Sequence, residues 1–279
     1  MAGFFERLNS ASLARQSLVC IGLDPDPDLM AIADVADFNA RIVDATNDLV
    51  CAYKPNFPFY EALGIPGLLA LERTVEHIRD VAPEVVLIAD CKRGDIGSTN
   101  KMYARALFDT WGFDAATVNA WGGGDSVEPY LEYTDRGVFV WCRSSNPGAA
   151  EFQDVPVSIE GGSVPLFEWM AIKAAEWNVT SSNVGLVAGA TYPSELSAVR
   201  ARCPGMPLLV PGVGSQGGDL DASLTHGLDR ESPNVLISSS RGITYASRKR
   251  ESFASAARES ASRLRDEING ILTREGRGW

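Results

Sequence analysis

Short β-rich runs alternate with stretches of helical periodicity along almost the whole chain, and this alternation restricts the possible folds more than any other feature. The final segment is the clearest helix, because Phe253, Ala257, Ala261 and Leu264 mark one apolar face. Apolar runs with few charges indicate strands that are buried on both faces. Eight such runs are present: 17–24, 51–56, 85–92, 114–121, 137–145, 183–190, 207–214 and 234–241. Strand–helix alternation of this kind predicts a parallel sheet.

The number of these units indicates the architecture. Eight strand–helix units predict an α/β protein with a single (β/α)8 TIM barrel, for which roughly 250 residues is typical. The alternative is a doubly wound sheet with a second, smaller domain, but no Pro-, Gly- or Ser-rich linker divides the chain. We therefore expect one barrel domain over residues 1–279. Residues 146–163 fall within one connection and lack clear periodicity, which is typical of an insertion or a lid.

The composition narrows the possible partners and sites. The net charge is −11, from 25 Lys and Arg against 36 Asp and Glu, which argues against general affinity for nucleic acid or an anionic membrane. No apolar run approaches the ~20 residues of a membrane span, and no secretory signal is evident, so we expect a cytoplasmic protein. The five cysteines show no CxxC spacing, and His77 and His226 lie far apart. These patterns argue against disulfides, a metal site and a Ser-His-Asp triad.

Polar or ionisable residues close five of the eight predicted strands, at Asp24, Lys54 with Asn56, Asp90 with Lys92, Ser144 with Ser145, and Arg241. In a barrel the carboxyl ends of the strands form the rim on which active sites are built. The sequence therefore predicts that these side chains meet around one cavity.

Asp90 and Lys92 form the densest part of this group. Side chains alternate along a strand, so Asp90 and Lys92 share one face while Cys91 points toward the helices. A structural ion pair at a strand end is the simpler interpretation. With Lys54 and Asp95 added, however, four charges would be costly to desolvate unless each is paired, and such arrangements cluster at functional sites. A lysine between two carboxylates is held as an ammonium and is predicted to donate a proton, unlike a Schiff-base lysine.

A glycine-rich loop follows the seventh predicted strand, where residues 212–217 match the GxGxxG pattern. The dinucleotide-binding form of this pattern needs an acidic residue at the end of the next strand, but that strand ends at Arg241. In barrels the loops after strands seven and eight commonly bind phosphate, and an arginine can hold a phosphate with two parallel hydrogen bonds. We therefore favour a phosphate site over a plain turn beside a surface arginine.

Four segments together resemble orotidine 5′-phosphate decarboxylases, most closely the longer bacterial subfamily. They are DxKxxDIGxT at 90–99, Tyr-Lys-Pro-Asn at 53–56, Arg-Ser-Ser-Asn-Pro-Gly at 143–148 and Pro-Gly-Val-Gly-Ser-Gln-Gly-Gly-Asp at 211–219. The first segment is specific, whereas the glycine loop alone would not be. The motifs extend from Asp24 to Arg241 and so cover almost the whole barrel.

This resemblance implies a carboxy-lyase that converts orotidine 5′-phosphate to UMP and CO₂ without a cofactor or metal, the last step of de novo pyrimidine nucleotide synthesis. It also implies a homodimer with sites at the subunit interface. Lys92 would protonate C6 as CO₂ leaves, and Asp90 would crowd the substrate carboxylate and hold Lys92. Asp95 and Thr99 would reach the partner's site and touch its ribose.

The resemblance further implies which residues bind the substrate: Asp24, Lys54, Thr99, Ser145, Gln216 and Arg241. Asp24 and Lys54 would contact ribose hydroxyls, and Lys54 would complete an alternating array of charges. Gln216 and Arg241 would hold the phosphate. Ser145 would contact the pyrimidine edge; Ser144 is the alternative, but the Ser-x-x-Gly spacing of the family favours Ser145.

Two other functions compete with this one. A related sugar-phosphate decarboxylase or aldolase, acting on 3-keto-gulonate or hexulose phosphates, shares DxKxxD but needs Mg²⁺ and an acidic ligand near the end of the second strand. Lys54 stands there instead and would repel a metal. A non-catalytic nucleotide-binding barrel would bind ligand without turnover, and the intact set of Asp90, Lys92 and Asp95 argues against it.

Overall fold

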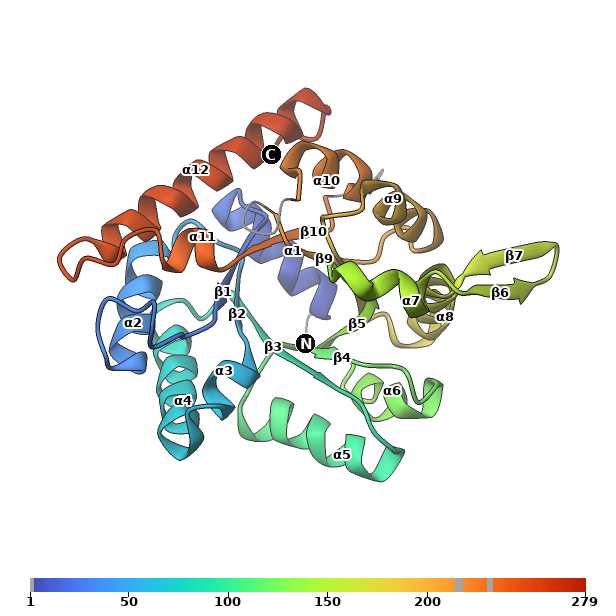
Figure 1. Cartoon of the computed structure of the whole chain (residues 1–279), viewed down its shortest axis with the longest axis horizontal. Coiled ribbons are helices and arrows are strands. Elements are labelled where there is room, and N and C mark those ends of the chain that lie inside the picture. Colours follow the sequence, from blue (N-terminus) through green and yellow to red (C-terminus); the bar gives the residue numbers. More distant parts are fainter. Residues whose placement is uncertain (1–2, 214–217, 230–232) are drawn as a thin grey trace.

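Eight parallel strands close into a barrel, in the order β1-β2-β3-β4-β5-β8-β9-β10 (Figure 1). The computed structural model describes residues 3–213, 218–229 and 233–279. The barrel strands are β1 (Val19–Leu23), β2 (Ala52–Pro55), β3 (Val86–Arg93), β4 (Ala115–Val118), β5 (Gly137–Arg143), β8 (Val184–Ala188), β9 (Leu208–Pro211) and β10 (Val235–Ser239). Each lies on one of the eight predicted runs, so the predicted barrel is confirmed and the doubly wound sheet is excluded.

Helices surround the barrel, and all but the first, which lies across one end, cover the outward faces of its strands (Figure 1). They are α1 (Phe4–Arg15), α2 (Val35–Thr46), α3 (Phe57–Glu61), α4 (Gly64–Val81), α5 (Gly97–Arg105), the π-helix η1 (Ala106–Thr110), α6 (Gly124–Leu131), α8 (Leu166–Ser181), α9 (Pro193–Arg202), α10 (Leu220–Gly227), α11 (Arg241–Thr244) and α12 (Phe253–Arg274). Ile21 and Leu87 of the strands pack with Phe38 and Ile42 of α2 in this outer core. Among the described residues, no helix is both long enough and apolar enough to cross a membrane.

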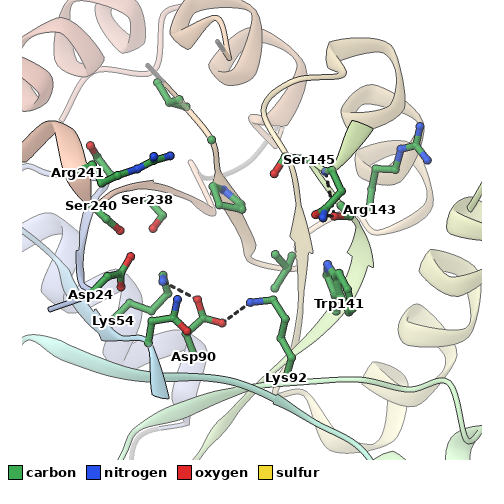
Figure 2. Close-up of a pocket in the computed structure, with 18 residues that line it drawn as sticks. Asp24, Lys54, Asp90, Lys92, Trp141, Arg143, Ser145, Ser238, Ser240 and Arg241 are labelled. Carbon is green, nitrogen blue, oxygen red and sulfur yellow. Dashed lines mark hydrogen bonds and ion pairs between the residues drawn. The ribbon is translucent and has the colours of Figure 1, made fainter. Parts of the chain in front are cut away.

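Helix α1 closes the amino-terminal end of the barrel. Phe4 and Leu8 belong to the apolar cluster inside the barrel, together with Ile88 and Phe139. The Phe4 and Phe139 rings meet edge to face at 5.9 Å, and Gly137 makes room for them, because a Cβ there would lie 2.4 Å from the Phe4 ring. The carboxyl end of the barrel instead holds a cavity lined by strand-end side chains (Figure 2).

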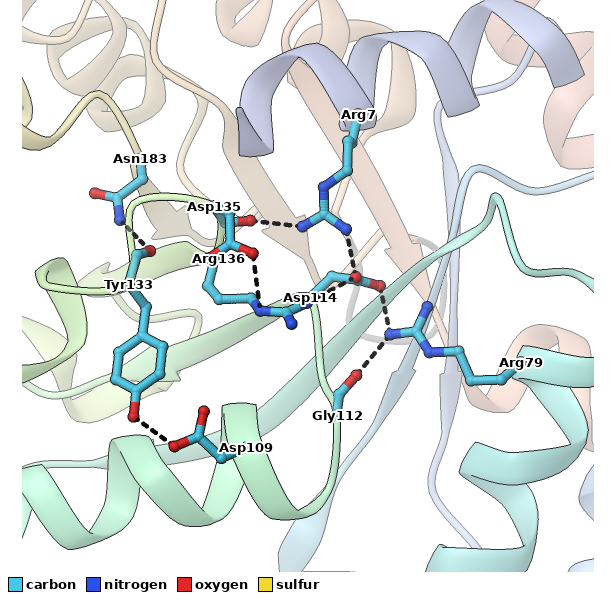
Figure 3. A network of polar contacts seen from close by, with 9 residues as sticks. All are labelled: Arg7, Arg79, Asp109, Gly112, Asp114, Tyr133, Asp135, Arg136 and Asn183. Atoms are coloured by element: carbon cyan, nitrogen blue, oxygen red, sulfur yellow. Dashed lines mark hydrogen bonds and ion pairs between the residues drawn. The ribbon is translucent and has the colours of Figure 1, made fainter. Parts of the chain in front are cut away.

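Asp114 fastens α1 and α4 to the closed end of the barrel (Figure 3). Its two carboxylate oxygens accept hydrogen bonds at 2.7 Å from Arg7 of α1 and from Arg79 of α4. Arg136 lies 3.5 Å away, and the amide of Leu87 donates at 2.9 Å. One buried carboxylate thus joins two helices to the sheet.

We expect Asp114→Asn to lower the free energy of unfolding by about 2 kcal/mol, because hydrogen bonds to charged groups are individually of that size and three guanidinium groups lose their shared anion. Asp135→Asn is the matched control, since the side chain of Asp135 is more exposed and its one ion pair within the described part of the chain is with Arg136, at 3.7 Å. Urea unfolding of the two variants measures the difference. Equal midpoints for both variants would contradict a fastening role for Asp114.

The connection after β5 contains regular structure that the sequence analysis did not predict. It holds the 3₁₀ turn η2 (Pro147–Ala149), the short helix α7 (Ala150–Gln153), and a hairpin of β6 (Pro156–Ile159) and β7 (Gly162–Pro165). The hairpin projects away from the barrel (Figure 1). Gly161 at its turn has φ 86°, and a Gly-Gly pair between β-rich residues is typical of a hairpin turn. Residues 146–163 therefore carry a protruding element, and a lid role remains a prediction.

Candidate active site

The open end of the barrel surrounds a cavity of about 220 Å³, lined from seven of the eight barrel strands or the residues directly after them. Six of the predicted site residues line it, and all six come from the five strand ends that the sequence predicted to converge (Figure 2). The six are Asp24, Lys54, Asp90, Lys92, Ser145 and Arg241. The prediction that these side chains meet around one cavity is therefore confirmed, whereas their roles stay predictions.

Asp90 stands at the centre of the charged group, with one lysine on each carboxylate oxygen. Lys54 Nζ lies 2.6 Å from Oδ2, and Lys92 Nζ lies 2.6 Å from Oδ1 (Figure 2). Burial alone would raise the pKa of Asp90, but the two ammonium groups outweigh it and hold that pKa well below its usual value. For Lys54, burial would lower the pKa, and the carboxylates of Asp90 and Asp24 raise it instead. Asp90 and Lys54 therefore stay charged at neutral pH.

Asp24 brings a second carboxylate to the cavity, next to β1. Its Oδ1 atom is buried and has no hydrogen-bond partner among the described residues. Burial raises the pKa of Asp24, and Lys54 together with a hydrogen bond from Ser240 opposes that rise. A buried acceptor without a partner is costly, so this oxygen is ready to accept a hydrogen bond from a ligand hydroxyl.

The end of β3 departs from a regular strand. Ala89 pairs with Ala116 of β4, but the next pair is Arg93 with Val118, so three residues of β3 bulge out against one of β4. Lys92 sits in this bulge with φ 44°, a left-handed conformation that is uncommon for a residue with a side chain. Simple alternation predicted that Asp90 and Lys92 face the cavity and that Cys91 packs outward, and both predictions are confirmed. It did not predict the bulge.

The β5 strand leads into Arg143, Ser144 and Ser145, which all line the cavity. The backbone amide of Asn146 donates a hydrogen bond to the Ser144 hydroxyl at 3.1 Å. Ser145 lines the cavity beside it, and the choice of Ser145 over Ser144 for a ligand contact stays a prediction. The sequence analysis quoted Arg143 in a motif but gave it no role, and its guanidinium turns away from the cavity (Figure 2). It forms a 2.7 Å ion pair with Asp154 and thereby ties the connection after β5 to the barrel.

The predicted phosphate site lies on the opposite wall of the cavity. Arg241, the first residue of α11, reaches the cavity with an exposed side chain (Figure 2), and Gly212 lines the same cavity. Gly212 has φ 99°, which favours glycine and lets the backbone turn sharply at this wall. Gln216 lies outside the described residues, so its predicted role stays a prediction.

Asp95 and Thr99 are not among the described residues that line this cavity. Asp95 lies exposed just before α5, where its carboxylate accepts from the amide of Ile96 at 2.6 Å, and Thr99 lies half-buried in the first turn of α5. Around them the apolar side chains of Ile96 and Trp121 are 68% and 72% exposed. Both predicted residues thus lie outside the chain's own cavity.

Comparison with known proteins agrees with this geometry. The sequence pattern of the orotidine 5′-phosphate decarboxylase / HUMPS family matches residues 17–256. Orotidine 5′-phosphate decarboxylase of Thermomicrobium roseum is 48% identical over 274 residues, covering 96% of this chain and 95% of the relative. The enzyme of that name from Dehalococcoides mccartyi is 47% identical over 267 residues, covering 95% and 97%. The structure of Leishmania donovani OMP decarboxylase superimposes with a TM-score of 0.85 at 36% identity, covering 98% of this chain and 100% of that chain. This chain therefore belongs to the orotidine 5′-phosphate decarboxylase / HUMPS family.

Proposed function

We propose that this chain decarboxylates orotidine 5′-phosphate to UMP and CO₂, the last step of de novo pyrimidine nucleotide synthesis, in the cytoplasm. The observation that carries the proposal is the buried Asp90 carboxylate with Lys54 and Lys92 at 2.6 Å from its two oxygens, within the barrel mouth. The relatives that are 47% and 48% identical over nearly the whole chain bear the name of this activity.

The chemistry requires a cation beside the carbon that loses its carboxylate. Departure of CO₂ from C6 leaves a carbanion in the plane of the pyrimidine ring, with no adjacent π-system to accept the electrons. The ammonium of Lys92 stabilises that developing charge more than it stabilises the substrate, and then delivers its proton to C6. Asp90 fixes the ammonium and places a negative charge near the departing carboxylate, which raises the energy of the bound substrate relative to the transition state.

The remaining walls of the cavity bind the rest of the nucleotide. The unpartnered Oδ1 of Asp24 accepts a hydrogen bond from a ribose hydroxyl, and Lys54 donates to the ribose. Ser145 contacts the pyrimidine edge. Arg241, together with Gln216, holds the phosphate. Binding energy from this remote phosphate offsets the crowding of charges at the reacting carbon.

The magnesium-dependent sugar-phosphate decarboxylases and aldolases are the second candidate. Their metal would need acidic ligands at the strand ends. The carboxylates that line this cavity among the described residues are those of Asp24 and Asp90. The Lys54 ammonium interacts electrostatically with both of them. A cation held between two carboxylates repels a divalent metal, so the residues present favour the metal-free reaction.

The direct test is incubation of the purified protein with orotidine 5′-phosphate, with and without EDTA, while the pyrimidine absorbance is followed. We expect conversion to UMP at the same rate in both samples. The Lys92→Ala protein, purified in the same way, controls for contaminating activity from the expression host. No turnover, or turnover that EDTA abolishes, would overturn the proposal; tight UMP binding without turnover would instead support a non-catalytic nucleotide-binding barrel.

We further propose a homodimer in which Asp95 and Thr99 complete the partner's site. Both residues lie outside the chain's own cavity, near a surface where Ile96, Met102 and Trp121 expose large apolar side chains. Exposed large apolar side chains are typical of interaction sites when they gather on one face, and a two-fold axis near α5 would bring each Asp95 toward the other subunit.

Co-expression of Lys92→Ala and Asp95→Ala chains tests this arrangement. Each variant alone should be nearly inactive. If Asp95 serves the partner's site, random pairing makes half of the dimers hybrid, and each hybrid keeps one of its two sites intact, so about a quarter of the wild-type activity should return. Co-expression of Lys92→Ala with Asp90→Ala is the matched control, because both residues serve the same site and no hybrid keeps an intact one. Recovery no greater than this control would place Asp95 in its own subunit's site.

A further inference from the structure

Thr117 of β4 lies directly behind the charged pair at the end of β3. Its side chain is fully buried. The hydroxyl accepts hydrogen bonds from two successive backbone amides of β3, that of Cys91 at 3.0 Å and that of Lys92 at 2.9 Å. It donates its own proton to Asp90 Oδ1 at 3.0 Å. The same oxygen of Asp90 receives Lys92 Nζ at 2.6 Å.

These contacts use the full capacity of a threonine hydroxyl, which has one donor and two acceptor positions. They also fall where the β-ladder is interrupted, because the pairing of β3 with β4 passes from Ala89 directly to Arg93. The hydroxyl therefore takes the place of backbone acceptors that a regular strand would have offered to the bulged residues. Lys92 holds its left-handed φ of 44° within this bulge, so Thr117 holds both ends of the Asp90–Lys92 contact.

We infer that Thr117 is a positioning residue that fixes the Lys92 ammonium against Asp90, an inference that rests on the proposed decarboxylation. Without the hydroxyl, the partly buried backbone amides of Cys91 and Lys92 lose their acceptor. Asp90 Oδ1 then keeps one hydrogen-bond donor, Lys92 Nζ. The bulge then relaxes, and Lys92 Nζ moves away from the position next to C6. A displacement of about 1 Å at a reacting group can cost on the order of 10²-fold in rate.

Thr117→Val removes the hydroxyl and keeps the branched shape, whereas Thr117→Ser keeps the hydroxyl and removes the methyl group. We expect kcat for orotidine 5′-phosphate to fall roughly 10²-fold in the valine variant, with KM and the affinity for UMP nearly unchanged. The serine variant should retain at least about a third of the wild-type kcat. Thr74→Val is the matched control, because Thr74 is also buried and its hydroxyl donates to Ala70 O at 2.7 Å and accepts from Asn39 at 3.1 Å, away from the cavity.

The inference is overturned if the valine variant keeps kcat within twofold of wild type, or if the serine and valine variants lose kcat equally. A fall in kcat matched by an equal fall in UMP affinity also overturns it, since that pattern indicates a general distortion. If the valine variant does not fold, Thr117→Cys replaces it, with the same outcomes. A crystal structure of the variant gives a readout independent of turnover: the Lys92 Nζ–Asp90 Oδ1 distance should lengthen beyond 2.6 Å, even if the wild-type protein proves inactive toward this substrate.

Discussion

Lys92→Ala is expected to lower kcat by at least roughly 10³-fold, because one side chain supplies both the stabilising charge and the proton, each of which is worth 10²–10³-fold or more. The barrel should remain folded, since the Lys92 side chain is 36% exposed and contributes little to the apolar core. Asp90 keeps its second partner, Lys54, at 2.6 Å. Steady-state kinetics with orotidine 5′-phosphate and thermal unfolding of the same preparation check the two parts of this prediction.

A lysine on the surface provides the control for this substitution. Lys173 pairs with Glu176 on the outside of α8 and does not line the cavity, so Lys173→Ala should leave kcat unchanged. The affinity for UMP, which lacks the carboxylate that leaves, should change much less in Lys92→Ala than kcat does. If Lys92→Ala retained more than a tenth of the wild-type kcat, the proton and the stabilising charge would have to come from another group.

The barrel could be predicted from the sequence because its strands are apolar on both faces. Each strand buries one set of side chains inside the barrel and the other against the helices, so the runs stand out from the amphipathic segments between them. Helix α1 was not predicted, since its apolar residues fill the barrel end rather than form a long stripe; Phe4 and Leu8 enter the interior cluster. The hairpin at β6 and β7 was overlooked although its Gly-Gly turn could have indicated it.

The strand-end rule was sufficient to place Asp24, Lys54, Asp90 and Lys92 around one cavity. The same rule could not reveal that Thr117 positions Lys92, because a threonine in an apolar run is typical of any strand. The hydrogen-bond partners of its hydroxyl depend on the register between β3 and β4. The bulge at the end of β3 could not be predicted for the same reason, since it depends on how β3 pairs with β4. A role for Asp95 in a partner's site depends on how two chains assemble, which the pattern of residues in one chain does not determine.

Arg241→Ala is expected to lower kcat/KM for orotidine 5′-phosphate by about 10²–10⁴-fold, because a guanidinium that makes two charge-assisted hydrogen bonds to a phosphate contributes about 1.5–3 kcal/mol through each. The side chain is exposed at the rim of the cavity, so its loss should leave the free energy of unfolding nearly unchanged. Arg248→Ala is the matched control: Arg248 is also exposed, seven residues further along the chain, and does not line the cavity.

The decisive comparison uses orotidine, which carries the same ring and carboxylate without the phosphate. Wild-type protein should prefer the phosphorylated substrate by a large factor, since energy from the phosphate contact is used at C6. Arg241→Ala should lose most of that preference by losing activity toward the phosphorylated substrate alone, with the slow reaction of orotidine unchanged. If the variant lost activity toward both substrates equally, Arg241 would act on the reacting end of the cavity, and the wall formed by Gly212 and Arg241 would not be the phosphate site.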